Sequence, residues 1–221
     1  MNITLDTPDG RIGGWLARPD RPSTMGLVVL QEIFGVTAHI RDVADRYAKE
    51  GFITLAPALF DIVTPGVDLP YDSDGMQQGR TLVTGLGFDR AVRLVSAAVS
   101  RLRDEGATQI GVVGFCWGGS LALLANLRLG LPAVSYYGAR NTNFLDEPLR
   151  APMLFHFGAK DASTPAADIE RERAAWPQAA FMVYPDAGHA FNRDCDPTHY
   201  RADAARLANA ETLAFFREHL A

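Results

Sequence analysis

The chain has 221 residues, of which 48% are hydrophobic and 21% are charged, and its formal net charge is −5 at pH 7. This length and composition allow a full hydrophobic core and exclude a largely disordered protein. The acidic balance argues against a broad surface that binds nucleic acid, because such surfaces need an excess of Lys and Arg.

Short apolar runs alternate with amphipathic segments in the first part of the chain. Gly26–Leu30 is a continuous apolar run, as expected for a strand that is covered on both faces. Residues 40–47 carry apolar side chains at helical spacing, and Gly51 is typical of a residue that caps a helix C-terminus. Phe52–Ala56 is predicted to be the next strand, which we expect Pro57 to end.

The segment Asp61–Gly87 is rich in Gly, Asp and Pro and has no clear period at its start. We interpret it as an excursion over the surface with a short helix at Gln77–Val83. A helical stripe of apolar residues follows between Phe88 and Leu102. Since no large insertion separates the predicted strands, we expect a pocket without a lid domain, although this excursion could cover it.

Strands and helices continue to alternate to the end of the chain. The predicted strands are Gln109–Phe115, Ala133–Tyr137, Met153–Phe157 and Ala180–Tyr184, and the predicted helices are Ser120–Leu129 and Pro197–Leu220. This alternation implies a mostly parallel central sheet with helices on both faces. Without internal repeats, low-complexity tracts or linkers, residues 1–221 are predicted to form a single α/β domain.

The N-terminal residues carry neither a basic start nor an apolar run, and no stretch is apolar for the length that crosses a bilayer. Neither a secretory signal nor a membrane partner is therefore predicted. Two cysteines, Cys116 and Cys195, allow at most one disulfide, too few for a disulfide-stabilised secreted scaffold. We expect a cytoplasmic protein with reduced thiols.

A glycine-rich turn follows the predicted strand Gln109–Phe115. Cys116 lies at its centre, in Gly-Phe-Cys-Trp-Gly-Gly, which is the spacing of a nucleophile elbow with cysteine in the place of serine. The glycines permit a strained turn that lifts the thiol above the sheet, and the positive end of the following helix favours the reactive thiolate. A buried core cysteine is the alternative interpretation, but the position between a strand and a helix favours a nucleophile.

An acid and a base follow Cys116 in the order that α/β hydrolases use, which is nucleophile, acid, histidine. Asp161 comes just after the strand Met153–Phe157, and His189 comes just after Ala180–Tyr184. Carboxyl ends of parallel strands meet at one edge of a sheet, where ligands bind. We therefore predict a Cys-His-Asp triad in which His189 pairs with the thiolate and protonates the leaving group, while Asp161 orients the imidazole.

Other titratable residues fit this site less well. His156 lies inside an apolar strand and is interpreted as a core histidine, and Asp186 lies too close to His189 in sequence to orient its ring. Cys195 has no elbow, and a disulfide with Cys116 is not expected. No spacing of His, Cys and carboxylates resembles a metal site, and no dinucleotide or phosphate motif is present. We expect no metal and no cofactor.

Four short motifs follow one another along the chain. They are Gln31-Glu32-Ile33-Phe34-Gly35, the elbow at residues 114–119, Phe157-Gly158-x-x-Asp161 and His189-Ala190-Phe191. Together they resemble the dienelactone hydrolase family, and the likeness covers nearly the whole chain. The resemblance implies the α/β-hydrolase fold. It also implies hydrolysis of the lactone ring of dienelactones from chloroaromatic breakdown to maleylacetate, through a thiolate and an acyl-enzyme, without metal or cofactor.

The resemblance also implies roles for residues around the nucleophile. Glu32 would be the extra carboxylate that this family places beside the resting thiol, where it helps to deliver thiolate when substrate displaces it. The backbone N–H groups of Ile33 and Trp117 would form the oxyanion hole, which the general rule for α/β hydrolases also indicates.

Arginines hold the carboxylate of the substrate in the family. Arg193, four residues after His189, matches one of them, and the alternative is a solvated loop cation. Arg80 is the only arginine in the 61–87 segment, where this sequence departs from the family pattern. Tyr137 could line the pocket or belong to the core.

The leading hypothesis is a hydrolase that cleaves a small ester or lactone, dienelactone-like and anionic if the arginines bind it. A general carboxylesterase or thioesterase whose pocket lacks the arginine pair is the alternative enzyme. A non-catalytic or ligand-sensing protein is disfavoured by the intact triad, and a redox protein by the lack of a Cys-x-x-Cys pair. The sequence leaves the physiological substrate and the oligomeric state open.

Overall fold

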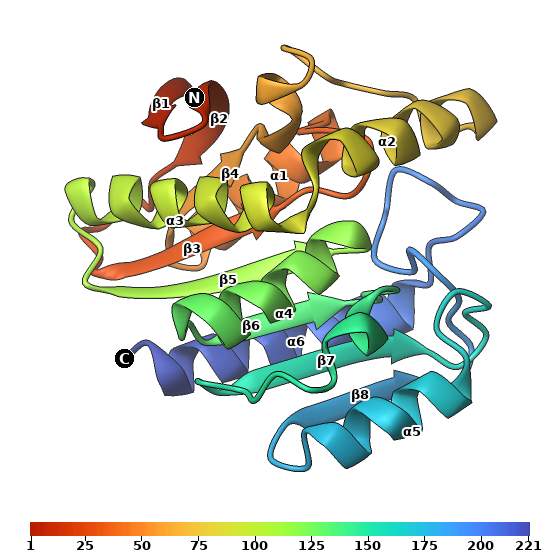
Figure 1. Ribbon diagram of the computed structural model, residues 1–221. Helices are drawn as coiled ribbons and strands as arrows, with labels where there is room; N and C mark the ends of the chain where they lie inside the picture. Colours follow the sequence, from red (N-terminus) through yellow and green to blue (C-terminus); the bar gives the residue numbers. More distant parts are fainter. The chain divides into compact units, whose positions relative to one another are not determined.

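The computed structural model describes residues 1–221, which divide into two compact units, Met1–Val112 and Val113–Ala221 (Figure 1). The first unit contains the strands β1 (Asn2–Thr7), β2 (Gly10–Ala17), β3 (Met25–Leu30) and β4 (Ile53–Pro57), the helices α1 (Ala38–Lys49), α2 (Ser73–Leu86) and α3 (Phe88–Asp104), and the 3-10 helix η1 (Leu59–Ile62). The strand β5 (Gln109–Phe115) spans the boundary. The second unit contains α4 (Trp117–Leu129), β6 (Ala133–Tyr136), η2 (Asn141–Phe144), β7 (Met153–Gly158), α5 (Ala166–Ala175), β8 (Ala180–Tyr184) and α6 (Ala202–His219). That residues 1–221 form one domain stays a prediction.

The strands of the first unit lie in the order β1-β2-β4-β3. β1 and β2 form an antiparallel hairpin, β2 pairs antiparallel with β4, and β3 pairs parallel with β4. Residues 27–30 of β3 have no exposed surface, as its continuous apolar run predicts for a strand covered on both faces. Figure 1 shows α3 in front of these strands and α1 behind them.

The strands of the second unit lie in the order β5-β6-β7-β8, and the pairs β6–β7 and β7–β8 are parallel. α4 packs on β6 and is buried along almost its whole length, which explains its apolar composition. α6 packs against β7 on the other face (Figure 1). Because these strands run in the same direction, the loops that follow β6, β7 and β8 emerge at one edge of the sheet.

The segment 61–87 differs most from its predicted form. Instead of a surface excursion with a short helix at Gln77–Val83, it contains the end of η1 and the 14-residue helix α2. Asp72 caps this helix, since its Oδ1 accepts the N–H of Gly75 at 2.8 Å. Gly75 and Gly79 occupy buried positions inside α2, so the buried face carries too few apolar side chains for a helical period to show in the sequence.

Other differences concern the boundaries and the presence of elements. β6 ends one residue early because Tyr137 has a positive φ of 42°, which breaks the extended conformation. α4 begins at Trp117 rather than Ser120, and α6 begins at Ala202 rather than Pro197. The β1–β2 hairpin and α5 were not predicted. None of the helices has the length and apolar character needed to cross a membrane.

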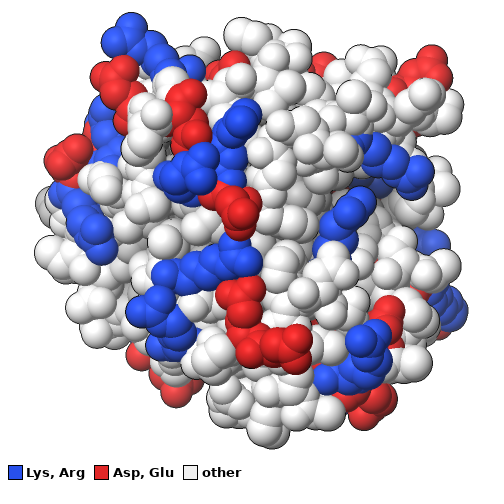
Figure 2. All heavy atoms as spheres, viewed as in Figure 1, with Lys and Arg blue, Asp and Glu red and all other residues white.

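Basic and acidic side chains lie next to each other over the face shown in Figure 2. The first unit contains ion pairs both between and within elements. Arg93 of α3 binds Asp9 in the β1–β2 turn with an N–O distance of 2.6 Å, and Arg101 binds Glu105 at 2.6 Å at the C-terminal end of α3. The first pair attaches the hairpin to the helix that packs beside it.

The carboxyl group of Glu172 in α5 is buried inside the second unit. Only 2% of the residue is exposed, and its Oε2 accepts the amide N–H of Asn141 at 3.0 Å. Burial raises the pKa of Glu172 to about 8, with a smaller contribution from the charge of Asp168, and the Asn141 hydrogen bond only partly offsets this. The native protein therefore keeps this side chain protonated at a pH where the unfolded chain has lost the proton.

We expect Glu172→Gln to stabilise the protein more at pH 8 than at pH 5. Between the ordinary pKa of Glu and a folded value of about 8, the native state binds more protons than the unfolded state, so its stability falls as the pH rises. Glutamine keeps the acceptor for Asn141 and has no proton to lose. Urea unfolding at the two pH values measures the effect, which should be at least ~1 kcal/mol larger at pH 8. An equal gain at both values would contradict a raised pKa.

Candidate active site

Cys116 lies in a strained turn between β5 and α4. Its φ is 56° and its ψ is −118°, a conformation that non-glycine residues rarely adopt and that often marks functional sites. A Cβ atom at Gly114 would collide with the carbonyl oxygen of Gly118, and one at Gly119 would lie 2.6 Å from the carbonyl oxygen of Tyr136. The glycines are therefore required by backbone crowding around the turn.

The loops that follow β7 and β8, which carry the predicted acid and base, are joined by a backbone hydrogen bond. The N–H of Lys160 donates to the carbonyl of Ala187 at 2.8 Å, and a Cβ atom at Gly158 would come within 2.5 Å of the same oxygen. This close contact brings Asp161 and His189 together. The His189 Nδ1 and the Asp161 Oδ2 are hydrogen bonded at 2.7 Å.

The His189 ring interacts with Cys116 as well as with Asp161. Burial by itself would lower the pKa of His189. The charge of Cys116, hydrogen bonds to Asp161 and Cys116, and the charge of Asp161 outweigh burial and raise this pKa well above its usual value. Since Nδ1 faces Asp161, Nε2 is the nitrogen left to face the sulfur. This arrangement favours the imidazolium form of His189 beside the sulfur of Cys116.

Asp161 is suited to carry a charge although only 1% of its side chain is exposed. Burial tends to raise its pKa, but the hydrogen bond and charge of His189 lower it below the usual value. The backbone N–H of Ser163 adds a further hydrogen bond to the Asp161 Oδ1 at 2.7 Å. These contacts favour the ionised carboxylate and orient it toward His189.

Two predicted binding residues lie in the same unit as Cys116, Asp161 and His189. Tyr137 is fully buried, and its ring stands edge-on to the His189 ring with a centroid distance of 5.1 Å. Arg193 is 6% exposed, and its Nη2 pairs with Asp196 Oδ2 at 3.1 Å. Arg193 is therefore a buried, paired cation and not a solvated loop residue. Trp117 is the first residue of α4, where the backbone N–H groups point out of the helix end.

The other predicted site residues belong to the first unit. Glu32 is 2% exposed and follows β3, and the neighbouring Ile33 is half-buried. The side chain of Gln31 is buried beneath them, and its Oε1 accepts the N–H of Leu59 at 3.1 Å. This bond fixes the start of the segment that carries Glu32 and Ile33.

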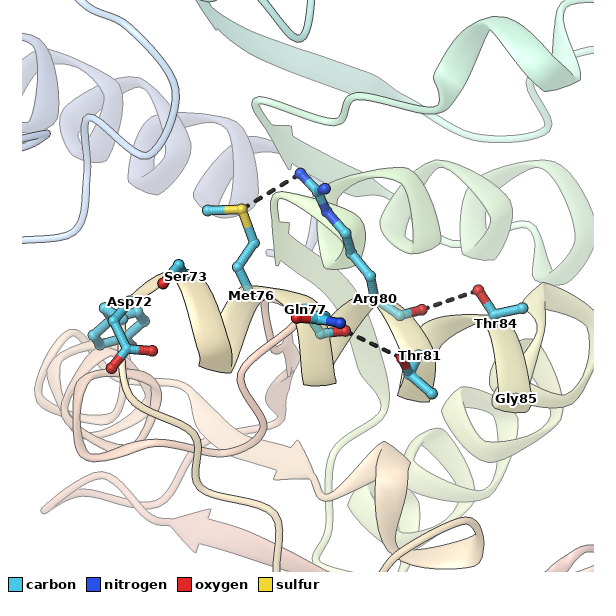
Figure 3. A pocket seen from close by; sticks show the side chains of 9 residues that line it. Asp72, Ser73, Met76, Gln77, Arg80, Thr81, Thr84 and Gly85 are labelled. Atoms are coloured by element: carbon cyan, nitrogen blue, oxygen red, sulfur yellow. Dashed lines mark hydrogen bonds between the residues drawn. The ribbon is translucent and has the colours of Figure 1, made fainter.

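Arg80 lies on the exposed side of α2 and lines a hollow of about 1060 Å³ along this helix (Figure 3). Its Nη2 lies 3.4 Å from the Sδ of Met76, one turn earlier on the same helix. Tyr71 and Gln77 line the same hollow. The guanidinium is thus presented to solvent from a helix, as the predicted short helix at Gln77–Val83 implies, although the helix is longer than predicted.

His156 and Asp186, the alternative candidates for the base and the acid, bind residues other than Cys116, Asp161 and His189. His156 is fully buried, with Nε2 3.0 Å from Thr212 Oγ1 and Nδ1 2.9 Å from the Tyr184 hydroxyl, and burial lowers its pKa to about 3. Its interpretation as a core histidine is confirmed. Asp186 is exposed and pairs with Lys160 at 2.8 Å. No group of three or more His, Cys, Asp or Glu side chains has an arrangement that could hold a metal ion.

Comparison with known proteins gives the family. The model of the dienelactone hydrolase family matches residues 12–220. The chain belongs to the dienelactone hydrolase family. The resemblance seen in the motifs is therefore confirmed, and so is the prediction of a hydrolase of the carboxylic-ester class.

Individual members of the dienelactone hydrolase family are similar to this chain over nearly its whole length. A carboxymethylenebutenolidase of Pseudomonas putida is 31% identical over 223 residues, which cover 96% of this chain and 94% of the relative. A protein of Klebsiella pneumoniae that bears the provisional name dienelactone hydrolase has a solved structure with a TM-score of 0.83, 28% identity and 98% of each chain covered. The solved dienelactone hydrolase of Anabaena variabilis, at 19% identity, shares the fold with a TM-score of 0.71 and covers 100% of this chain and 98% of its own. The predicted α/β-hydrolase fold is confirmed.

Proposed function

We propose that this protein hydrolyses a small ester or lactone by nucleophilic attack of Cys116, with a dienelactone-like compound as substrate. The observation that carries the proposal is the chain of contacts from Cys116 through His189 to Asp161 at a strained strand-to-helix turn. The carboxymethylenebutenolidase of Pseudomonas putida supports the substrate class, since its name describes a butenolide lactone that carries a carboxymethylene group.

The reaction proceeds in two stages. The Cys116 sulfur attacks the carbonyl carbon, the ring C–O bond breaks, and the leaving oxygen takes the proton from the His189 imidazolium. The product of this stage is a thioester on Cys116. His189 then removes a proton from water, which attacks the thioester, and the C–S bond breaks to release the carboxylate and regenerate the thiolate. Asp161 keeps the imidazole in one tautomer throughout.

Further residues assist these steps in our proposal. The N–H groups of Trp117 and Ile33 stabilise the oxyanion, a type of contact that is stronger in the transition state than in the ground state. Glu32 helps to deliver the thiolate when substrate enters. Arg193 and Arg80 bind the carboxylate of the substrate through charge-assisted hydrogen bonds.

Mass spectrometry of the acyl-enzyme tests the nucleophile directly. After brief mixing with p-nitrophenyl acetate and acid quenching, an acetyl group should be found on the peptide that contains Cys116. An acetyl group on another residue, or turnover without any adduct under conditions that trap thioesters, would reject Cys116 as the nucleophile. Sulfenic acid formed with peroxide, in the absence of any acyl adduct, would favour a redox role instead.

We expect Arg193→Gln to weaken turnover of an anionic lactone by about ten- to a hundred-fold while a neutral ester of equal size changes little. A charge-assisted contact to a carboxylate contributes about 1.5–3 kcal/mol, and glutamine removes that charge. The values of kcat/KM for the two substrates measure the effect. The matched control is Asp196→Asn, which breaks the ion pair at 3.1 Å but leaves the guanidinium.

If Arg193 only supported its loop, the two variants would slow both substrates alike. Equal loss on the neutral and the anionic substrate would therefore favour a general carboxylesterase over a dienelactone-like hydrolase. The cytoplasmic location and the absence of nucleic-acid or membrane partners also stay predictions from the sequence.

A further inference from the structure

The segment that carries Glu32 and Ile33 is held by a second segment, residues 67–71, which we call the strap. The N–H of Leu69 donates to the carbonyl of Phe34 at 2.9 Å, and Gly35 and Asp68 form an isolated antiparallel bridge. These contacts place the strap alongside residues 32–35, which we call the site segment, in the manner of a short additional strand. The strap therefore restricts where the backbone at Ile33 can lie.

A hydroxyl pair and a ring contact fix the far end of the strap. The hydroxyl of Tyr71 lies 2.7 Å from Thr37 Oγ1, and the Tyr71 ring stands edge-on to the Phe34 ring at a centroid distance of 4.7 Å. Thr37 is the N-cap of α1. The site segment is thus held between a helix cap and the strap.

The helix α2 packs against both the site segment and the strap at its two buried glycines, Gly79 and Gly75. A Cβ atom at Gly79 would collide with the carbonyl oxygen of Ile33 and would lie 3.0 Å from both the carbonyl carbon and the Cβ of that residue. A Cβ atom at Gly75, one turn earlier, would collide with the carbonyl oxygen of Pro70 in the strap. The helix backbone packs against these two peptide groups as closely as the absence of side chains permits.

We propose that Gly79 is a positioning residue for the oxyanion hole and that it acts through the Ile33 backbone. The inference rests on the proposed function, in which the Ile33 N–H binds the oxyanion. The carbonyl of Ile33 and this N–H lie in adjacent peptide groups joined by the Ile33 Cα. A Cβ atom at Gly79 would press on both the carbonyl and the Cβ of Ile33, so the whole residue has to move and its N–H moves with it. An oxyanion donor works only at 2.7–3.1 Å from the developing charge, and displacement by about 1 Å costs as much as a hundred-fold in rate.

The test is Gly79→Ala in the full chain. The added methyl group must push the Ile33 carbonyl away, so we expect kcat for p-nitrophenyl acetate to fall by about ten- to a hundred-fold with KM within about two-fold. The rate at which iodoacetamide alkylates Cys116 should stay within about two-fold of the wild-type rate, because alkylation needs the thiolate and forms no oxyanion. A substitution that only destabilised the fold would change both the rate of ester turnover and the rate of alkylation.

Gly85→Ala is the matched control on the same helix. A Cβ atom there meets only Val63 Cγ1, at the ordinary distance of 3.5 Å. We expect its kcat to match the wild type and its unfolding temperature to be equal or slightly higher, because alanine favours a helix more than glycine does. This variant separates the effect of the Ile33 contact from the general effect of alanine in α2.

Tyr71→Phe gives a second route if Gly79→Ala does not fold. It removes the hydroxyl contact to Thr37 and keeps the ring, and we expect kcat to fall several-fold with unchanged alkylation. Folded Gly79→Ala with the kcat of the wild type would overturn the positioning role, and so would an unfolded Gly79→Ala combined with an unaffected Tyr71→Phe. Ester turnover that does not require Cys116 would overturn the proposed function itself and the positioning role with it.

Discussion

Replacing Cys116 with alanine is expected to lower kcat/KM for p-nitrophenyl acetate at least about a thousand-fold. The methyl group cannot form the thioester, and no other nucleophile is positioned against His189 by the contacts described above. The residual rate should come from the oxyanion hole and from binding alone. Initial rates at saturating and limiting substrate separate kcat from KM.

Cys195→Ala is the control for this variant. Cys195 is the only other thiol of the chain, and it is exposed. We expect the activity of this variant to match that of the wild type, and we expect both variants to unfold at the temperature of the wild type. Retention of more than a tenth of the wild-type kcat/KM by Cys116→Ala would mean that another residue attacks the substrate.

The second large effect is expected from Asp161→Asn, which should lower kcat by about a hundred- to ten-thousand-fold without unfolding the protein. The carboxylate accepts the Nδ1–H of His189 at 2.7 Å, whereas an amide can present its NH₂ group and select the wrong tautomer. The hydrogen bond and the charge of Asp161 both raise the pKa of His189. Their loss lowers that pKa, so the basic limb of the pH–rate profile should move to lower pH.

Asp186→Asn is the matched control for the acid. Asp186 lies three residues before His189 in the sequence, but it is exposed and paired with Lys160. We expect kcat within about two-fold of the wild type and an unmoved pH profile. A larger loss with Asp186→Asn than with Asp161→Asn would reverse the assignment of the orienting acid.

The site was open to prediction where chemistry depends on local spacing. The elbow around Cys116 could be recognised because crowding between Gly114 and Gly118 is a matter of a few consecutive residues. Asp161 and His189 could be selected because each follows a strand, and parallel strands bring their carboxyl ends to one edge. In the same way His156 could be assigned to the core from the apolar strand around it.

Elements whose apolar pattern is weak could be predicted only in part, as with the residues 77–83 of α2, or not at all, as with α5. α2 carries glycines on its buried face, where Gly75 and Gly79 pack most closely against the backbone carbonyls of Pro70 and Ile33. Its sequence therefore lacks the stripe of large apolar residues that marks α3. α5 has only two buried residues, Ile169 and Glu172, and one of them is a carboxyl. A buried glutamate is indistinguishable from a surface glutamate in the sequence.

The sequence by itself determined the family, the fold class and the positions of Cys116, Asp161 and His189 after successive strands, because these depend on local spacing and on strand alternation. Only the tertiary structure decided the surroundings of these groups. It showed the 2.7 Å bond that joins His189 to Asp161, the burial of Arg193, and the contact of Gly79 with Ile33. Such contacts join residues that are far apart in the chain, and their distances depend on how the backbone packs, which no local pattern encodes.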